Sequence, residues 1–274
     1  MADDTLSGTD VPLILLTVVA LKAGARIMEI YGAGFTVASK SDESPVTEAD
    51  AAAEAVIIEE LAQLARPIPV VAEESVSAGH IPETGEAFFL VDPLDGTREF
   101  ISRNGEFTVN IAYIEKGEPV AGVVYAPALG EIFWGARGKG AFKAPVRHGV
   151  IGAQTPIAVR TAPEDGLTAI GSRSHGSPET EDWLKAYDVR DFVAAGSSLK
   201  FCRVAEGVAD LYPRHGRTME WDTAAGDAIL RAAGGAVTTF DGQPLTYGKR
   251  TPEGAPDFAN PYFVASGDPA LKKH

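Results

Sequence analysis

The hydrophobic positions near the N-terminus follow a helical period. Five apolar residues fall on one face of a helix: Leu13, Leu16, Ala20, Ala23 and Ile27. Polar residues occupy the remaining faces, which is typical of an amphipathic core helix. A second helix is predicted over residues 47–64, where apolar side chains again recur on one face.

Short apolar runs predict strands after these helices. In the first half of the chain the runs cover residues 69–72, 88–91, 120–125 and 131–134, and they favour an antiparallel sheet. From about residue 156, strands alternate with helices: strands at 167–171, 191–195 and 209–213, and helices at 199–206 and 222–233. The pattern predicts a layered α/β protein with two helix-covered sheets, in an N-terminal subdomain (1–153) and a C-terminal subdomain (154–274).

Composition and charge limit the partners and the compartment. The chain has 274 residues and a formal net charge of −14, which argues against a nucleic acid polymer as partner. A small anion held by bound cations remains compatible with this charge. Cys202 is the only cysteine, so no internal disulfide is expected. The apolar run at 11–21 is too short to span a bilayer and follows acidic residues, so a cytoplasmic protein is expected.

Acidic residues gather where the predicted elements begin or end. Six of them do so: Asp50, Glu73, Glu74, Asp92, Asp95 and Asp222. Each has an ordinary explanation when taken alone. Asp95 precedes a glycine, which is a turn signal, Asp222 suits a helix N-cap, and two adjacent glutamates often begin a solvated loop.

Taken together, these residues favour a site for a hard divalent cation. Mg²⁺ binds several oxygen ligands, including backbone carbonyls. A tight turn between Asp92 and Asp95 would aim both carboxylates and the Leu94 carbonyl at one point. Gly96 and Thr97, at the start of the next helix, would offer N–H groups and a hydroxyl to a phosphate. Two cations about 3.5 to 4 Å apart would stabilise the attacking and leaving oxygens of an in-line displacement.

Two separated motifs, VDPLDGTREF and EWDTAAGDAIL, resemble the paired signature of the inositol monophosphatase superfamily of magnesium-dependent, lithium-sensitive phosphatases. Further stretches resemble more narrowly its CysQ-type members, the 3'(2'),5'-bisphosphate nucleotidases: SPVTEAD, VAEES, RNGEFTVNIA, AAGSSLKFCRVAEGVADLYPR and NPYFVAS. The resemblance covers nearly the whole chain in the expected order. It implies a five-layered α-β-α-β-α fold with the active site between the two halves.

The resemblance also implies roles for the acidic residues. Five groups would bind two or three magnesium ions: the side chains of Glu73, Asp92, Asp95 and Asp222 and the carbonyl of Leu94. Gly96 and Thr97 match the phosphate-binding turn. Asp50 and Thr47 match the pair that positions or deprotonates the attacking water, although a capping box explains the same spacing and the two roles are compatible. Ser75 departs from the family, because these relatives have an aspartate after the two glutamates.

Contacts to the nucleotide are expected in the C-terminal half. His175 matches a histidine that the nucleotidases place beside the adenosine, and Ser197 matches another substrate residue. Lys200 and Arg214 also match, and their charges suit a second, non-reacting phosphate. Asp222 is expected to contact the substrate as well as the metal. A surface histidine and a solvated lysine are the ordinary alternatives for His175 and Lys200.

These observations favour a magnesium-dependent phosphomonoesterase that hydrolyses adenosine 3',5'-bisphosphate, a by-product of sulfate assimilation, to AMP and phosphate. Asp50 and Thr97 would orient the nucleophilic water and accept its proton. Two alternatives stay open: the same chemistry on inositol monophosphate or fructose 1,6-bisphosphate, and a catalytically silent magnesium- or nucleotide-binding sensor. The presence of Asp50 weighs against the sensor. The oligomeric state is open, and so is peripheral attachment to the inner membrane, which is described for some bacterial relatives.

Overall fold

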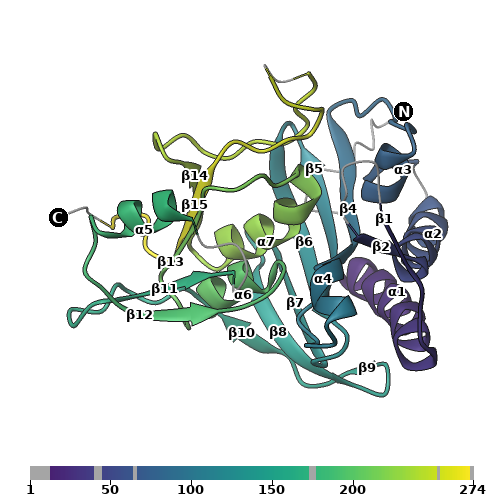
Figure 1. Ribbon diagram of the computed structural model, residues 1–274, viewed down its shortest axis with the longest axis horizontal. Coiled ribbons are helices and arrows are strands. Elements are labelled where there is room, and N and C mark those ends of the chain that lie inside the picture. Colours follow the sequence, from purple (N-terminus) through teal and green to yellow (C-terminus); the bar gives the residue numbers. More distant parts are fainter. Residues whose placement is uncertain (1–12, 40–44, 64–66, 173–176, 252–253, 272–274) are drawn as a thin grey trace, which may run out of the picture.

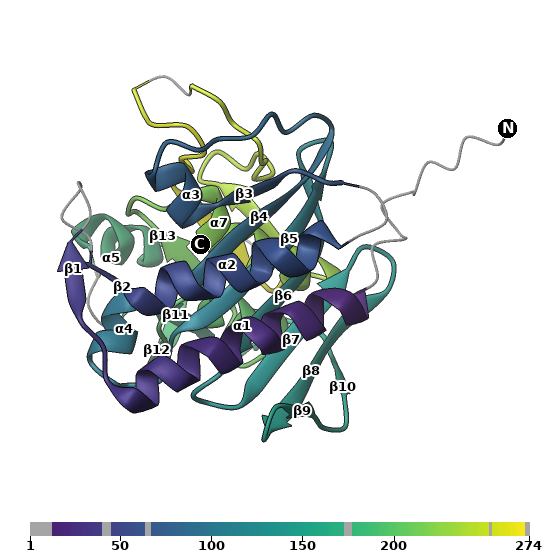
Figure 2. The ribbon, with the colours of Figure 1, turned by 90° about the vertical axis from the view of Figure 1, so that its right-hand side faces the viewer.

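The computed structural model describes residues 13–39, 45–63, 67–172, 177–251 and 254–271. Two long helices, α1 (Leu13–Ala33) and α2 (Glu48–Ala62), lie side by side as an outer layer (Figures 1 and 2). Leu16, Ala23 and Ile27 of α1 are fully buried, as the helical period predicted. The second predicted helix is confirmed with slightly shifted ends, and its last position, residue 64, falls outside the described residues. None of the helices within the described ranges is long and apolar enough to cross a membrane.

The next layer is a large sheet against which α1 and α2 pack. Its strands are, in spatial order, β10 (Thr155–Ile157), β8 (Gly140–Arg147), β7 (Glu131–Ala136), β6 (Glu118–Ala126), β5 (Thr108–Glu115), β4 (Ala87–Asp95) and β3 (Val70–Ala72), with β9 (Val150–Ile151) paired to β8. The neighbours pair antiparallel, as predicted, except β3 and β4, which are parallel. The exception arises because the connection between β3 and β4 is a crossover that contains a short helix, α3 (Glu73–Ser77). β1 (Val37–Ser39) and β2 (Pro45–Thr47) form a separate two-stranded sheet.

A second sheet lies on the other side of the molecule, and two helices are enclosed between the sheets (Figure 1). This sheet has the order β12 (Val189–Ala194), β11 (Leu167–Gly171), β13 (Leu211–Arg214), β15 (Phe263–Ser266) and β14 (Ala236–Thr239). The enclosed helices are α6 (Leu199–Ala205) and α7 (Glu220–Ala232), and α5 (Pro178–Leu184) lies beyond the second sheet. The α-β-α-β-α layering implied by the resemblance is therefore confirmed, whereas several elements were not predicted, among them α5, β5, β8, β14 and β15. The division of the chain at residues 153–154 stays an interpretation.

The contact between α7 and the large sheet is unusually close. A Cβ atom on Gly122 of β6 would lie 2.5 Å from the carbonyl oxygen of Ala225, so a side chain at this position would push the helix away. A Cβ on Gly226 would lie 2.6 Å from the ring of Phe201 in α6. These two glycines let α7 pack tightly against both β6 and α6, and α7 carries Asp222 near its first turn.

Candidate active site

The acidic motif of β4 is a bulge within a strand and does not form a turn. β4 continues to Asp95, so the tight turn predicted between Asp92 and Asp95 is wrong. Asp92 pairs with Asn110 and Asp95 with Thr108, which leaves one extra residue on β4. Because alternate residues of β5 face the same side, Asn110 and Thr108 share a face, and the extra residue brings Asp92 and Asp95 onto one face of β4.

Three carboxylates from separate segments of the chain converge where β3 ends beside the bulge of β4. Oxygen atoms of Glu73, Asp92 and Asp222 all lie within 4.8 Å of one another. The parallel pairing of β3 with β4 explains half of this arrangement, because it sets Ala72 beside Val91 and so places the following residues, Glu73 and Asp92, next to each other. The third carboxylate, that of Asp222, comes from α7, which packs against the large sheet.

The electrostatics of this cluster favour a bound cation. Burial, together with the negative charges of Asp95 and Glu73, raises the pKa of Asp222 well above its ordinary value. Like charges this close repel one another, and a divalent cation would reverse that repulsion. Carboxylate oxygens are the ligands that hard divalent cations bind, so the residues present fit such an ion.

Asp95 and Leu94 lie next to the three-carboxylate cluster. One oxygen of Asp95, Oδ2, accepts hydrogen bonds from the Ser198 hydroxyl at 2.9 Å and from the Asn110 amide at 3.4 Å. The Leu94 N–H donates to Asp92 Oδ1 at 3.0 Å, which fixes the bulge next to the Leu94 carbonyl. The role of that carbonyl as a metal ligand stays a prediction.

A second acidic group, Asp50, reaches the site through a threonine. Asp50 is buried at the start of α2, and its Oδ2 accepts both the Thr47 N–H and the Thr47 hydroxyl at 2.8 Å. This is the capping box that the spacing suggested. The hydroxyl of Thr97 lies 3.2 Å from the other oxygen of Asp50, so the cap and the link to the phosphate motif coexist.

The turn before Thr97 has a backbone that requires glycine. Gly96 adopts a left-handed conformation, with φ at 89°, and a Cβ there would lie 2.1 Å from Ser197 Oγ. Ser197 Oγ lies 2.7 Å from the carbonyl oxygens of both Asp95 and Glu106. Ser197 was predicted to bind substrate, and the structure shows that its hydroxyl holds this turn against the C-terminal half.

A cavity of about 210 Å³ lies beside these groups. Eight of the predicted site residues line it: Glu73, Asp95, Gly96, Thr97, Ser197, Lys200, Arg214 and Asp222. Lys200 is buried, and its ammonium group donates to the carbonyl oxygens of Ser197 at 2.6 Å and Ala195 at 3.4 Å. Burial lowers the pKa of Lys200 to about 8. His175 lies outside the described residues.

The cavity also has lining residues that the sequence reasoning did not single out. They include Arg98, Ser172, Tyr212, Arg217 and Thr218. Arg98 and Arg217 add two positive charges to those of Lys200 and Arg214. The sequence contained a weak indication that these two arginines belong to the site, because Arg98 directly follows Thr97 and Arg217 comes three residues after Arg214.

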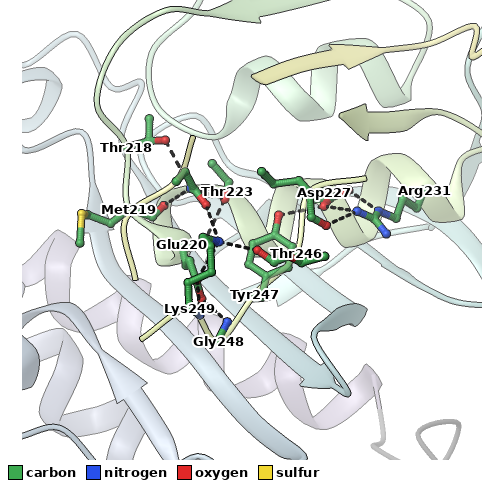
Figure 3. A network of polar contacts seen from close by, with 12 residues as sticks. Thr218, Met219, Glu220, Thr223, Asp227, Arg231, Thr246, Tyr247, Gly248 and Lys249 are labelled. Atoms are coloured by element: carbon green, nitrogen blue, oxygen red, sulfur yellow. Dashed lines mark hydrogen bonds and ion pairs between the residues drawn. The ribbon is translucent and has the colours of Figure 1, made fainter. Parts of the chain in front are cut away.

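The start of α7 is held by a network of buried polar contacts (Figure 3). Glu220, which has no exposed surface, accepts the N–H groups of Gly248 and Lys249, and the Lys249 ammonium lies 2.7 Å from it. A helix N-cap was the ordinary alternative for Asp222, but the helix begins at Glu220 and Asp222 is its third residue. Its Oδ2 nevertheless accepts the Met219 N–H at 2.7 Å, which caps the helix and orients the carboxylate.

The fold and site define a layered α/β protein in which acidic side chains able to hold a divalent cation share one cavity with basic ones. The model of the inositol monophosphatase family matches residues 12–266. The chain belongs to the inositol monophosphatase family, whose phosphatases use divalent metal ions.

Within this family, named relatives are highly similar to the chain. It is 48% identical over 246 residues to the 3'(2'),5'-bisphosphate nucleotidase CysQ of Salmonella typhimurium, covering 89% of this chain and 95% of that protein. The CysQ of Escherichia coli K12 is 45% identical, and the match covers 90% of this chain and 96% of that protein. The crystal structure of CysQ from Bacteroides thetaiotaomicron superposes with a TM-score of 0.76 at 39% identity, covering 93% of this chain and 96% of that one.

Proposed function

We propose that the protein is a magnesium-dependent 3'(2'),5'-bisphosphate nucleotidase that hydrolyses adenosine 3',5'-bisphosphate to AMP and phosphate, and that it works in the cytoplasm in connection with sulfate assimilation. The observation that carries this proposal is the composition of the cavity. The carboxylates Glu73, Asp95 and Asp222 line it together with Lys200 and Arg214. A bisphosphate needs both kinds of group, because one phosphate reacts and the other must only be bound. The named relatives at 45–48% identity support the same substrate.

The metal shell in this proposal consists of Glu73, Asp92, Asp95, Asp222 and the carbonyl of Leu94. Bound Mg²⁺ would neutralise the reacting phosphate and lower the pKa of a bound water. The donors around the carboxylates orient them: the Met219 N–H for Asp222, and Ser198 and Asn110 for Asp95. Such contacts around metal ligands commonly set their geometry and their affinity.

The proton of the attacking water would leave through Thr97 and Asp50. Thr97 lines the cavity, and its hydroxyl donates to Asp50 Oδ1, so Thr97 Oγ1 can accept a proton from water while it passes its own to Asp50. Thr47 holds the other oxygen of Asp50 and so keeps Oδ1 directed at Thr97. In the reaction, the water oxygen bonds to phosphorus, the bond from phosphorus to the 3'-oxygen breaks, and the leaving oxygen takes a proton.

The second phosphate would lie against the basic residues of the C-terminal half. Arg214 and Arg217 come from the end of β13 and the loop that follows it, and Lys200 comes from α6. Guanidinium groups bind phosphate through paired hydrogen bonds, and the ammonium group of Lys200 adds a positive charge to the same cavity. His175, whose structure is not described, stays a prediction as the residue beside the adenosine.

A phosphate-release assay with four substrates tests the proposal. Adenosine 3',5'-bisphosphate, its 5'-phosphosulfate analogue, inositol monophosphate and fructose 1,6-bisphosphate are compared at the same Mg²⁺ concentration, with EDTA as the blank. We expect the highest kcat/KM with one of the two nucleotides. Preference for inositol monophosphate would overturn the choice of substrate. Tight nucleotide binding without turnover would favour the sensor. In that case Asp50→Asn would leave the affinity for the nucleotide unchanged.

A further inference from the structure

A buried glutamate on α2 binds the segment that carries the metal ligand Glu73. Glu54 is only 5% exposed and lies in the middle of α2. Its Oε2 accepts the Glu74 N–H at 2.7 Å. Its Oε1 accepts the Ser75 N–H at 2.8 Å and the Ser75 hydroxyl at 2.6 Å. One carboxylate thus receives three hydrogen bonds from the first turn of α3, and hydrogen bonds to a charged group are stronger than neutral ones.

These contacts determine how the backbone of Glu73 is held. On one side Glu73 follows β3, whose last residue, Ala72, pairs with Val91. On the other side Glu73 is followed by Glu74 and Ser75, the two residues that donate to Glu54. α3 has five residues, which is too short to be stable on its own. The hydrogen bonds to Glu54 therefore hold the backbone that directly follows Glu73.

Glu54 also connects the metal cluster to the proposed proton path. Asp50 and Glu54 are four residues apart in α2, so they lie one turn apart on the same face. Asp50 receives the Thr97 hydroxyl, and Glu54 receives the first turn of α3. One rigid helix therefore sets the position of both parts of the site relative to each other.

We propose that Glu54 is a positioning residue for the metal site: its carboxylate fixes the first turn of α3 so that the Glu73 carboxylate meets those of Asp92 and Asp222. This inference rests on the proposed function, since it requires the cluster to bind Mg²⁺. Ser75 takes part through its hydroxyl. An aspartate at this position, which the related motif has, would set a second carboxylate against Glu54.

The test measures Mg²⁺ affinity directly. Mg²⁺ is titrated calorimetrically into metal-free wild type, Glu54→Ala, Glu54→Gln, Ser75→Ala and Glu59→Gln, and activity is measured against Mg²⁺ concentration in the same set. Glu59 is exposed on the opposite side of the same helix and serves as the control. We expect Glu54→Ala to weaken Mg²⁺ binding about ten- to a hundred-fold. Ser75→Ala should weaken it less, because it removes one of three hydrogen bonds, and Glu59→Gln should leave it unchanged.

Saturating Mg²⁺ separates positioning from loss of structure. We expect high Mg²⁺ to restore most of kcat in Glu54→Gln, because the ligand Glu73 is still present and the ion can order it. A lower Tm with unchanged Mg²⁺ affinity well below that Tm would show a purely structural role and overturn the inference. Ser75→Ala keeps the test decisive if Glu54→Ala does not fold.

The wild-type protein distinguishes failure of this inference from failure of the proposed function. If it binds Mg²⁺ but hydrolyses none of the four substrates, the proposed function is wrong, and the calorimetric comparison still decides the role of Glu54. If it binds no Mg²⁺, both are overturned.

Discussion

Replacing Glu220 by glutamine tests how firmly α7, and with it Asp222, is held in place. Glu220 is completely buried and accepts the N–H groups of Gly248 and Lys249, and the Lys249 ammonium completes an ion pair (Figure 3). Glutamine keeps the size of the side chain but turns one acceptor oxygen into an NH₂ group, which would face a backbone N–H. It also leaves the mostly buried Lys249 ammonium without its counter-charge.

The expected loss follows from these two effects. A buried donor left without an acceptor costs about 1 to 3 kcal/mol, and breaking a buried ion pair costs about 3 to 5 kcal/mol, with the lower end applying here because Lys249 is partly exposed. We expect Glu220→Gln to reduce the free energy of unfolding by about 3 kcal/mol. For a domain of this size, that corresponds to a fall in Tm of about 6 to 12 °C.

Urea and thermal unfolding followed by circular dichroism measure this change. Glu118→Gln is the matched control, because Glu118 pairs with Arg137 at the surface, where the two side chains are 58% and 52% exposed. An exposed pair contributes less than about 1 kcal/mol, so this variant should unfold with the wild type. A Glu220→Gln protein within about 1 kcal/mol of wild type would refute the argument that this network holds the start of α7.

Four further predictions concern the site. Asp222→Asn should lower activity by orders of magnitude with the fold retained, because it removes charge from the metal shell; near-normal turnover at ordinary Mg²⁺ would end this assignment. Lithium, titrated at fixed Mg²⁺, should inhibit uncompetitively or in a mixed manner, because it would occupy a Mg²⁺ position with half the charge; insensitivity at high millimolar lithium would contradict the expected metal arrangement. Lys200→Ala and Arg214→Ala should each lower kcat/KM for adenosine 3',5'-bisphosphate about ten- to a hundred-fold and hardly affect any activity on inositol monophosphate; equal losses on both substrates would contradict a distal-phosphate site. Mg²⁺ at about a hundred times its Kd should stabilise the wild type by about 2.7 kcal/mol relative to EDTA, and Asp222→Asn should abolish most of that shift in Tm.

Strong local periodicity made much of the fold predictable from the sequence. The buried faces of α1 and α2 and the succession of β12, α6, β13 and α7 followed from the spacing of apolar residues, whereas α5, between β11 and β12, was missed. α3 was missed because five residues are too few to show a helical period. β4 was ended too early because Pro93 and two carboxylates are typical of a turn, whereas the pairing of Asp95 with β5 continues the strand through a bulge.

The site was predictable where its chemistry is local. The motif around Asp92, Gly96 and Thr97 lies in one short segment, so its residue types and spacing were informative. The residues that orient the site were missed, because they act across long separations in the chain. Ser198 contacts Asp95 from 103 residues away, and Glu54 reaches the first turn of α3 across about 20 residues. A single sequence contains no periodic or spacing signal for such contacts.

The way the carboxylates are held explains why they belong to one site. Left to themselves, Glu73, Asp92 and Asp222 would turn away from one another, because their charges repel at the distances observed. The fold prevents the carboxylates from turning away by fixing one oxygen of each of two of them with a backbone hydrogen bond. The Leu94 N–H donates to Asp92 Oδ1, and the Met219 N–H donates to Asp222 Oδ2. These donors orient the carboxylates and hold them close together, and burial together with the neighbouring charges of Asp95 and Glu73 raises the pKa of Asp222. A helix cap or a turn needs no such concentration of charge, whereas binding a divalent cation in a fixed geometry does.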